Sequence, residues 1–437
     1  MNFTVIGMGK IGLPLAVQIA EKGFSVKGLD IDAHTVATIN EGREPFPNER
    51  DLLKKLAVVL ANKKFEATLD AKNAISGANV VIVVVPLFVN NEGTPDFTAL
   101  DSVTRQIGSY IKRGTLISYE TTLPIGTTRN RFLRSLEDVS GLKVGTEFNL
   151  VFSPERVSSG RIFSDLRKYP KVVGGITEKC TMLGVETYKS ILDFDQRDDL
   201  PKSNGVWAMS STEESEFVKV AETTYRDVNI GLANQFSRYA SKMNLDIAKV
   251  IEAANSQHFS HIHNPGIAVG GHCIPIYPQF YMWNDSEATI VKAARDLNSK
   301  MPAHAIDLIK KTEADFRRKK ILVLGLSYRS GVKEVAFSGS LTLDKILRDE
   351  NVVPSFYDVL YSKEEIIELG LVPFDGNGES IDIAIIQTED SSHLELINQE
   401  LTKCQLIFDG RNIVNNFNYA GNARIIGFGK NILPKYL

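Results

Sequence analysis

The sequence predicts an α/β protein in which two doubly wound domains are joined by a central domain with a long helix. Short apolar runs alternate with helical patterns in residues 1–205 and again in residues 301–437, as in parallel sheets buried on both faces. Within residues 206–300, apolar residues recur every three or four positions for about 30 residues, which is the period of one long helix. These three ranges are the predicted domains.

The composition excludes several classes of protein. The 437 residues carry a formal net charge of −3, which does not favour nucleic acid or a membrane surface as a partner. No apolar stretch approaches the ~18 residues needed to span a bilayer, and the N-terminus lacks the basic region of a signal peptide. Cys180, Cys273 and Cys404 are too few and too scattered for a disulfide framework or a metal site. We therefore expect a soluble cytoplasmic protein that binds no metal.

A glycine-rich segment follows the first predicted strand. The apolar run of residues 3–6 leads into Gly7-Met8-Gly9-Lys10-Ile11-Gly12 and a helical pattern, and a second strand, residues 25–29, ends at Asp30. A GxGxxG between strand and helix, with an acid about 20 residues on, is the fingerprint of a Rossmann-like dinucleotide-binding domain. The first glycine forms the tight turn, the second admits the pyrophosphate, and the third allows the helix to pack closely on the strand.

Asp30 selects between the two forms of the cofactor. Its carboxylate can accept hydrogen bonds from the adenosine ribose hydroxyls and would repel a 2′-phosphate, so we predict NAD rather than NADP. Asp32 has the simpler interpretation of a solvated turn residue. The residues expected to bind NAD are Gly7, Gly9, Lys10, Ile11, Gly12, Asp30, Pro86 and Thr122.

Polar clusters follow three more predicted strands, residues 80–85, 115–119 and 149–152. Ligands of open α/β sheets bind beyond the carboxyl ends of the strands, so Thr122 and Glu155 are expected near the nicotinamide. Two alternatives stay open. In the first, the threonines of the segment 120–128 serve only as helix caps and turn residues. In the second, Glu155 only forms an ion pair with Arg156 or another surface cation.

The central helix is predicted to begin after the N-cap segment 211–214. Its apolar residues form one stripe, which predicts a buried face: Phe217, Ala221, Tyr225, Val228, Leu232, Phe236, Tyr239 and Met243. A helix this long often lies between domains or in a dimer interface, so a homodimer or higher homo-oligomer is expected. On another face Lys219, Thr223 and Arg226 form a polar row, which is either solvated or lines a site.

Residues 270–275, Gly-Gly-His-Cys-Ile-Pro, place Cys273 between a glycine pair and a proline. Paired glycines allow unusual backbone conformations and leave room for a ligand. The thiol is therefore a candidate nucleophile. From these residues alone, a small buried hydrophobic residue is the favoured interpretation, because most free cysteines are buried.

A second sheet is predicted from strands in residues 321–326, 355–358, 381–386 and 405–409. Its first turn, residues 325–329, lacks the GxGxxG pattern, so we expect no second NAD. Arg329, Lys333 and Arg411 lie at or just after strand ends, where guanidinium groups could bind the phosphates of a substrate. Each of them is alternatively a surface charge.

Together these motifs resemble the UDP-glucose/GDP-mannose dehydrogenase family over nearly the whole chain. The matching segments, in order, are GMGKIG at 7–12 with Asp30, ETTLPIGTT at 120–128, SPER at 153–156, Lys219 with RDVNI at 226–230, GGHCIP at 270–275 and DGR at 409–411. The GGHCIP and SPER forms are most similar to the branch that acts on UDP-N-acetylhexosamines such as UDP-N-acetylglucosamine and UDP-N-acetylmannosamine.

The resemblance implies an NAD-dependent, four-electron oxidation of a sugar C6 alcohol to a carboxylate, for surface polysaccharide precursors. Cys273 would form a thiohemiacetal with the intermediate aldehyde and then a thioester, which water hydrolyses. Lys219 would stabilise the oxyanions, Glu155 would act as general acid and base, and Thr122 would order the water. The residues implied to bind the UDP-sugar are Glu155, Arg156, Lys219, His272, Arg329 and Arg411.

The chain also departs from the family pattern around the sugar and the hydrolytic water. Tyr277 replaces an aspartate, and a phenol cannot replace a carboxylate base near neutral pH. The other replacements are Thr223 for asparagine, Leu87 for threonine, Ala336-Phe337-Ser338 for Arg-Glu-Ser, and the segment His258 to His263 for a loop arginine.

Three other functions remain open. The first is a UDP-glucose 6-dehydrogenase, and the second is a two-electron dehydrogenase on the same scaffold. The third is a protein that binds NAD or a sugar nucleotide without turnover. The number of NADH molecules formed per sugar distinguishes the two-electron enzyme and the binding protein from the four-electron enzyme.

Overall fold

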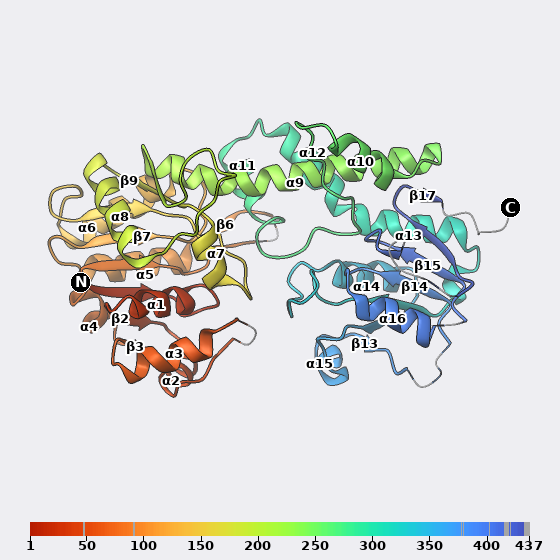
Figure 1. Ribbon diagram of the computed structural model, residues 1–437, viewed down its shortest axis with the longest axis horizontal. Coiled ribbons are helices and arrows are strands. Elements are labelled where there is room, and N and C mark those ends of the chain that lie inside the picture. Colours follow the sequence, from red (N-terminus) through yellow and green to blue (C-terminus); the bar gives the residue numbers. More distant parts are fainter. Residues whose placement is uncertain are drawn as a thin grey trace. The chain divides into compact units, whose positions relative to one another are not determined.

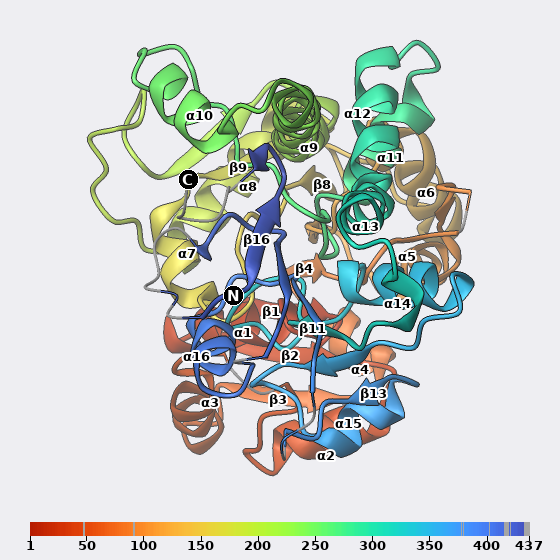
Figure 2. The same cartoon turned by 90° about the vertical axis from the view of Figure 1, so that its right-hand side faces the viewer.

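The computed structural model describes residues 1–46, 49–90, 92–376, 378, 380–401, 403–414, 419 and 421–431. The chain divides into two compact units (Figure 1), and Figure 2 gives a second view of the same chain. The N-terminal unit comprises Met1–Glu222 with Gln279–Asp285, and the C-terminal unit comprises Thr223–Pro278 with Ser286–Leu437. The domain boundaries expected after residues 205 and 300 stay predictions. In the described part of the chain, no helix is both long and apolar enough to cross a membrane.

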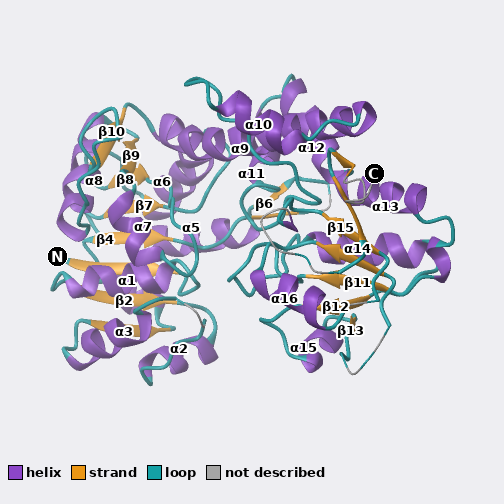
Figure 3. Cartoon of the chain, turned by 45° about the vertical axis from the view of Figure 1, so that its right-hand side comes forward, coloured by secondary structure: helices purple, strands orange, loops and turns teal. Residues whose placement is uncertain are grey.

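The N-terminal unit contains an eight-stranded sheet of order β10-β9-β8-β7-β4-β1-β2-β3 (Figure 3). The chain runs outward from β1 in both directions, so the predicted doubly wound fold is confirmed. All neighbouring strands are parallel except β8 and β9, whose antiparallel pairing was not predicted. The strands are β1 Asn2–Ile6, β2 Ser25–Leu29, β3 Phe65–Thr68, β4 Val80–Val83, β7 Leu116–Tyr119, β8 Asn149–Phe152, β9 Lys171–Gly175 and β10 Val206–Met209. A small hairpin pairs β5 (Phe88–Val89) with β6 (Pro95–Asp96).

Helices cover both faces of this sheet. One continuous apolar core joins the sheet to α1 (Gly12–Glu21), α2 (Ala33–Asn40), α3 (Leu52–Ala61), α7 (Ile162–Lys168) and α8 (Glu178–Ile191). Against the other face lie α4 (Ala71–Ser76), α5 (Thr98–Tyr110), the π-helix η1 (Thr128–Leu133) and α6 (Arg134–Ser140). Tyr119 marks that second face, because its ring stacks on Phe132 of η1 and its hydroxyl lies 2.7 Å from Thr104 of α5.

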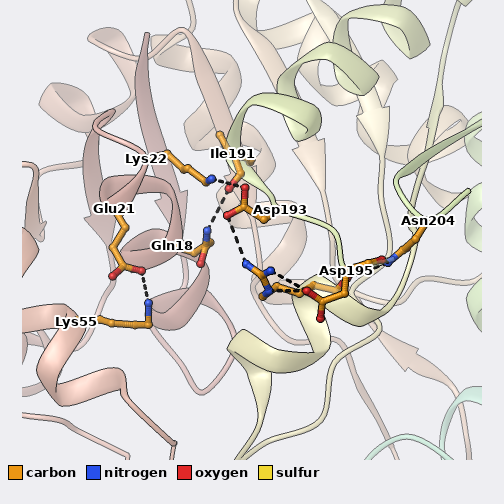
Figure 4. Close-up of polar contacts among 9 residues, drawn as sticks. Gln18, Glu21, Lys22, Lys55, Ile191, Asp193, Asp195 and Asn204 are labelled. Atoms are coloured by element: carbon orange, nitrogen blue, oxygen red, sulfur yellow. Dashed lines mark hydrogen bonds and ion pairs between the residues drawn. The ribbon is translucent and has the colours of Figure 1, made fainter. Parts of the chain in front are cut away.

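Polar contacts at the surface fix the segment that follows α8 (Figure 4). Lys22, just after α1, forms an ion pair with Asp193, and Gln18 of α1 donates to the carbonyl of Ile191. The side-chain amide of Asn204 donates to the carbonyl of Asp195 at 2.8 Å. Exposed pairs of this kind contribute about 0–1 kcal/mol each, so they set the path of the loop more than the stability of the fold.

The predicted long helix is α9, Thr212–Met243, and the expectation that its apolar stripe is buried is wrong. Six large side chains of the stripe are 39–59% exposed: Phe217, Tyr225, Leu232, Phe236, Tyr239 and Met243. Apart from Val220, the buried face instead carries small and polar residues: Ser215, Glu216, Lys219, Thr223, Asp227, Gly231, Ala233, Asn234, Ser237 and Ala240. Periodicity shows that one face of a helix is apolar, but it does not show whether the same chain covers that face.

The C-terminal unit contains the second predicted sheet, with order β13-β12-β11-β14-β15-β16-β17. Its strands are β11 Ile321–Leu324, β12 Ser355–Tyr357, β13 Val372–Pro373, β14 Ile383–Ile386, β15 Leu406–Asp409, β16 Arg424–Gly427 and β17 Lys430–Asn431. One face packs on α13 (Met301–Thr312), α14 (Gly339–Asp349) and α15 (Lys363–Glu368), and the other on α16 (Ser391–Gln399). The unit also contains α10 (Ile247–Asn255), α12 (Thr289–Ser299) and the 3-10 helix η2 (Phe316–Arg318), and α11 (Tyr277–Asn284) crosses the unit boundary.

Candidate active site

The expected NAD-binding residues of the N-terminal unit follow neighbouring strands at one edge of its sheet. Gly7 follows β1, Asp30 follows β2 and Pro86 lies just beyond β4. Thr122 and Glu155 lie beyond β7 and β8. Because these strands are adjacent in the order β8-β7-β4-β1-β2, the five residues lie along the carboxyl edge, where doubly wound sheets bind their ligands.

The structure explains the three glycines of the fingerprint in different ways. Gly7 has a φ of +95°, which favours glycine. A Cβ on Gly12 would lie 1.9 Å from the carbonyl oxygen of Gly7, so only glycine fits there. A Cβ on Gly9 would meet nothing within 4 Å, so the fold itself does not require glycine at that position. The open space beside Gly9 fits the close approach of a pyrophosphate. Lys10 is exposed and Ile11 half-buried at the start of α1.

Asp30 is tied to the same loop. One of its carboxylate oxygens accepts a hydrogen bond of 2.6 Å from the backbone N–H of Met8, and the other accepts from Asp32 N–H at 3.0 Å. Asp32 itself is the N-cap of α2 and accepts from the N–H groups of His34 and Thr35. Asp32 is therefore an exposed helix cap, which is more specific than the solvated turn residue that the sequence suggests.

The threonines of segment 120–128 divide into two groups. The hydroxyls of Thr121 and Thr127 donate to the carbonyls of Val85 and Pro124, and that of Thr128 donates to Glu216. Of these three, Thr127 makes the turn bond of the structural alternative, whereas Thr121 and Thr128 hold together segments that are distant in the sequence. Thr122 is buried, and its hydroxyl makes no hydrogen bond with the described residues.

Glu155 has a different ion-pair partner from those predicted. Its carboxylate lies 2.9 Å from the ammonium of Lys171, which also lies 2.7 Å from the carboxylate of Glu120. Arg156 instead forms an ion pair of 2.9 Å with Glu222. Burial raises the pKa of Glu120 to about 7, whereas Lys171 outweighs burial and holds the pKa of Glu155 below its ordinary value.

Neither Lys171 nor Glu120 is among the site residues predicted from the sequence. In the sequence each is only a charged residue at one end of an apolar strand. Such a residue does not indicate which side chain it will pair with.

The loop that bears Cys273 packs against residues 328–337 of the C-terminal unit. Gly271 has a φ of +88°, and its N–H donates to the carbonyl of Ala336 at 3.1 Å. A Cβ on Gly270 would lie 2.6 Å from Tyr328 Cβ. Cys273 is exposed, whereas the other two cysteines of the chain are buried. Its interpretation as a small buried hydrophobic residue is therefore excluded.

His272 and the histidine-bearing stretch before it are also held by defined contacts. His272 Nε2 lies 3.6 Å from Glu334 Oε2, and its ring packs edge-on against Phe337. Asn229 of α9 donates to the carbonyl of His261 and accepts from the N–H of His263.

The two predicted phosphate-binding arginines line one cavity of about 400 Å³ at the carboxyl edge of the second sheet. The lining residues are Tyr328, Arg329, Ser330, Thr388, Glu389, Asp390, Ser391 and Arg411. The guanidinium of Arg411 donates to the carbonyl of Gln387 at 2.6 Å, and burial lowers its pKa to about 10. Lys333 forms an ion pair with Glu365 instead, which agrees with its alternative as a surface charge.

The predicted site residues fall on both units. Thr122, Glu155 and Lys219 belong to the N-terminal unit, and Lys219 is a buried cation of α9. His272 and Cys273 belong to the C-terminal unit together with the two arginines of its cavity. In the described part of the chain, no group of three or more His, Cys, Asp or Glu side chains could hold a metal ion.

Comparison with known proteins agrees with this geometry. Residues 1–192 match the NAD binding domain of the UDP-glucose/GDP-mannose dehydrogenase family, and residues 213–300 match its central domain. A UDP-N-acetyl-D-mannosamine dehydrogenase of Pyrococcus horikoshii is 32% identical over 425 residues, 95% of this chain and 96% of the relative.

Solved structures agree as well. The UDP-D-ManNAc dehydrogenase structure from Pyrococcus horikoshii superimposes with a TM-score of 0.85 at 30% identity, covering 99% of this chain and 100% of that chain. The UDP-N-acetyl-mannosamine dehydrogenase of Staphylococcus aureus has a TM-score of 0.82 at 25% identity, with 98% of each chain covered. The matched domain indicates NAD as the cofactor. This chain belongs to the UDP-glucose/GDP-mannose dehydrogenase family.

Proposed function

We propose that this chain oxidises the C6 hydroxyl of a UDP-N-acetylhexosamine to a carboxylate and so supplies a uronate for surface polysaccharide. The observation that carries the proposal is the exposed thiol of Cys273 in its glycine-held loop, in contrast to the buried Cys180 and Cys404. Relatives named UDP-N-acetyl-D-mannosamine dehydrogenase at 28–32% identity make UDP-N-acetylmannosamine the first candidate substrate.

The first oxidation converts the C6 alcohol to an aldehyde. Glu155, held ionised by Lys171, takes the hydroxyl proton as general base. The buried ammonium of Lys219 stabilises the negative charge that develops on the C6 oxygen. NAD, when bound at the glycine-rich loop, supplies the electron acceptor for both oxidations.

The second half of the reaction takes place on the sulfur of Cys273. The thiolate adds to C6 of the aldehyde to give a thiohemiacetal, and the second oxidation converts this adduct to a thioester. A water molecule held by the Thr122 hydroxyl attacks the thioester carbon, which releases the uronate and restores the thiol. Because Tyr277 supplies no carboxylate base, we expect this hydrolysis to limit the rate.

The nucleotide part of the substrate is assigned to the cavity of the C-terminal unit. Arg329 and Arg411 line that cavity, and guanidinium groups suit the oxygens of a diphosphate. His272 and Arg156 are assigned to the sugar. Their contacts with Glu334 and Glu222 fix the orientation of both side chains.

The exposed stripe of α9 is assigned to a homodimer interface. Its six large side chains lie on one face of the helix, and soluble proteins seldom leave an apolar face of that extent uncovered. A second copy of this helix is the partner with the matching surface.

The test is a panel of sugar nucleotides given to the full-length protein with NAD. The panel contains UDP-N-acetylmannosamine, UDP-N-acetylglucosamine, UDP-N-acetylgalactosamine and UDP-glucose, and NADH and uronate are counted per sugar consumed. Two NADH and one uronate from an N-acetylhexosamine support the proposal. One NADH per sugar indicates the two-electron enzyme, and binding without NADH from any donor indicates the binding protein. A preference for UDP-glucose contradicts the choice of hexosamine.

A second experiment tests the role of the thiol. Cys273→Ser should bind NAD as the unchanged protein does, yet form no uronate. In the unchanged protein, rapid acid quenching followed by mass spectrometry should find a uronyl thioester on the peptide that contains Cys273. A Cys273→Ser variant that still forms two NADH per sugar contradicts the thioester route.

A further inference from the structure

A series of buried polar groups extends from Glu155 into the N-terminal unit. Lys171 Nζ, on β9, lies 2.9 Å from Glu155 Oε2 and 2.7 Å from Glu120 Oε2. The hydroxyl of Tyr188, on α8, donates to Glu120 Oε1 at 2.5 Å and lies 2.7 Å from Ser118 Oγ. Each group is within hydrogen-bond distance of the next, so the series is unbroken from Glu155 to Ser118.

The series contains one cation and two carboxylates in a region from which water is largely excluded. The side chains of Lys171 and Glu120 are 4% and 0% exposed, and that of Glu155 is 12% exposed. Arg156, the neighbouring cation in the chain, directs its guanidinium to Glu222. With both carboxylates ionised the cluster carries one uncompensated buried charge, which is unfavourable, and a single proton removes it.

The contacts of the two glutamates indicate which of them holds this proton. Glu155 Oε1 accepts the backbone N–H of Arg156 at 2.7 Å, which favours its ionised form. Glu120 faces the hydroxyls of Tyr188 and, beyond it, Ser118, and a hydroxyl can donate or accept, so these bonds can reverse when the carboxyl gains a proton. Burial raises the pKa of Glu120 to about 7, so its proton is exchangeable near neutral pH.

We propose that Lys171 and Glu120 are positioning residues that carry protons away from Glu155 during turnover. Above about pH 7, where Glu120 is ionised, a Glu155 that has taken the proton of the substrate hydroxyl passes a proton to Lys171 while Lys171 releases one of its own to Glu120. Glu155 returns to a carboxylate, Glu120 becomes a carboxylic acid, and Lys171 remains an ammonium ion. After product release the same transfers in reverse return the proton to Glu155, the least buried group of the three, which gives it to water. The inference rests on the proposed function, because Glu155 receives this proton only if the chain oxidises an alcohol.

The relay predicts opposite changes, in two variants, in the pH dependence of the rate at which a single turnover forms its first NADH. Lys171→Met removes the cation beside Glu155, so the acid limb of the profile should move to higher pH by about 1–3 units, and Lys171→Arg should restore it. Glu120→Gln removes a negative neighbour of Glu155 and the acceptor of its proton. Its acid limb should move to lower pH, and the rate of first-NADH formation should fall about tenfold while Kd for the sugar nucleotide is unchanged.

Glu49→Gln is the matched control. Glu49 is another partly buried carboxyl of the same unit whose pKa is raised by burial, and it contacts the N–H groups of Gly160 and Ile162 rather than Glu155. Its pH profile should follow that of the unchanged protein. Profiles of Lys171→Met and Glu120→Gln that superimpose on the unchanged profile overturn the relay, even if both variants are less stable.

A second measurement keeps this test separate from that of the proposed function. If the unchanged protein oxidises no sugar nucleotide, the proposed function fails, and isotope-edited infrared spectroscopy then decides whether the proton is held as inferred. Glu216 is also protonated at about pH 6, so the bands are compared by difference. A protonated glutamate component that is present in the unchanged protein and in Glu49→Gln, but missing from Glu120→Gln, supports the proton-holding role of Glu120. A spectrum unchanged by Glu120→Gln overturns it.

Discussion

The carboxylate of Glu216, in the second turn of α9, accepts a hydrogen bond of 2.8 Å from the backbone N–H of Thr128. It also accepts from the Thr128 hydroxyl and the N–H of Gly126, so it fastens α9 to the turn that follows Thr122. Glu216 is fully buried, and burial raises its pKa to about 7 despite these donors.

This contact makes stability depend on pH. The unfolded chain releases the proton of Glu216 near its ordinary pKa of 4.5, whereas the folded protein releases it near 7. Folding stability should therefore fall as the pH rises through this window, by about 3 kcal/mol. Glu216→Gln has no proton to lose, so this fall should be absent from the variant. Urea unfolding at about pH 5 and about pH 8 measures the difference, and equal pH dependence in both proteins contradicts the prediction.

Substitution of two glycines of the fingerprint should affect cofactor binding in one case and folding stability in the other. Gly9→Ala places a Cβ in open space, so the thermal midpoint should be unchanged while Kd for NAD rises about tenfold or more, equivalent to about 1.4 kcal/mol. Gly12→Ala places a Cβ against the carbonyl of Gly7 and should destabilise the fold by about 3 kcal/mol or more. Calorimetry of NAD binding and thermal unfolding check both. A Gly9→Ala protein that binds NAD normally removes the argument for a pyrophosphate at this glycine.

The sequence predicted the glycine-rich loop and Asp30 because each depends on a short pattern within one βαβ segment. It did not predict that Lys171 is the partner of Glu155, because that contact requires the antiparallel pairing of β8 with β9. The residues are 16 positions apart with a helix between them, and no local period links them.

The stripe of α9 was assigned to the wrong environment for a different reason. Apolar spacing identified the face correctly, yet the chain covers the opposite face, where Asp227 and Asn234 form a polar network with α12. A buried polar face gives no apolar periodicity from which it could be recognised.

The network of Asp227 offers a third prediction. Asp227 Oδ2 lies 2.7 Å from Arg295 Nε, and burial raises the pKa of Asp227 to about 6. Arg295→Met leaves a buried carboxylate without its cation and should cost about 3–5 kcal/mol. Without Arg295 the pKa of Asp227 rises further, so the cost should shrink as the pH falls and a proton neutralises the carboxyl. Asp227→Asn combined with Arg295→Met removes the unpaired charge and should be more stable than the single variant. Urea unfolding compares the three proteins, and a double variant that is no more stable contradicts the account.

The charge of Asp30 should set the preference for NAD. Asp30→Asn keeps an acceptor for the N–H of Met8 but removes the repulsion of a 2′-phosphate. The ratio of kcat/KM for NADP to that for NAD should rise about tenfold, or about 1.4 kcal/mol. Asp32→Asn is the control, because Asp32 only caps α2 and asparagine caps helices equally well. An unchanged ratio in Asp30→Asn, or an equal rise in both variants, contradicts this role.

The exposed stripe of α9 should hold two copies of the chain together. Leu232 is 45% exposed near the middle of the stripe, and Leu232→Asp places a charge where the partner helix would pack. A buried unpaired carboxylate costs several kcal/mol, enough to shift a dimer to monomers at micromolar concentration. Val58→Asp, on α3, is the control, because Val58 is 49% exposed yet lies outside the stripe. Sedimentation velocity should find a dimer for the unchanged protein and for Val58→Asp, but a folded monomer for Leu232→Asp. A monomeric unchanged protein, or a Leu232→Asp variant that remains a dimer, excludes α9 as the interface.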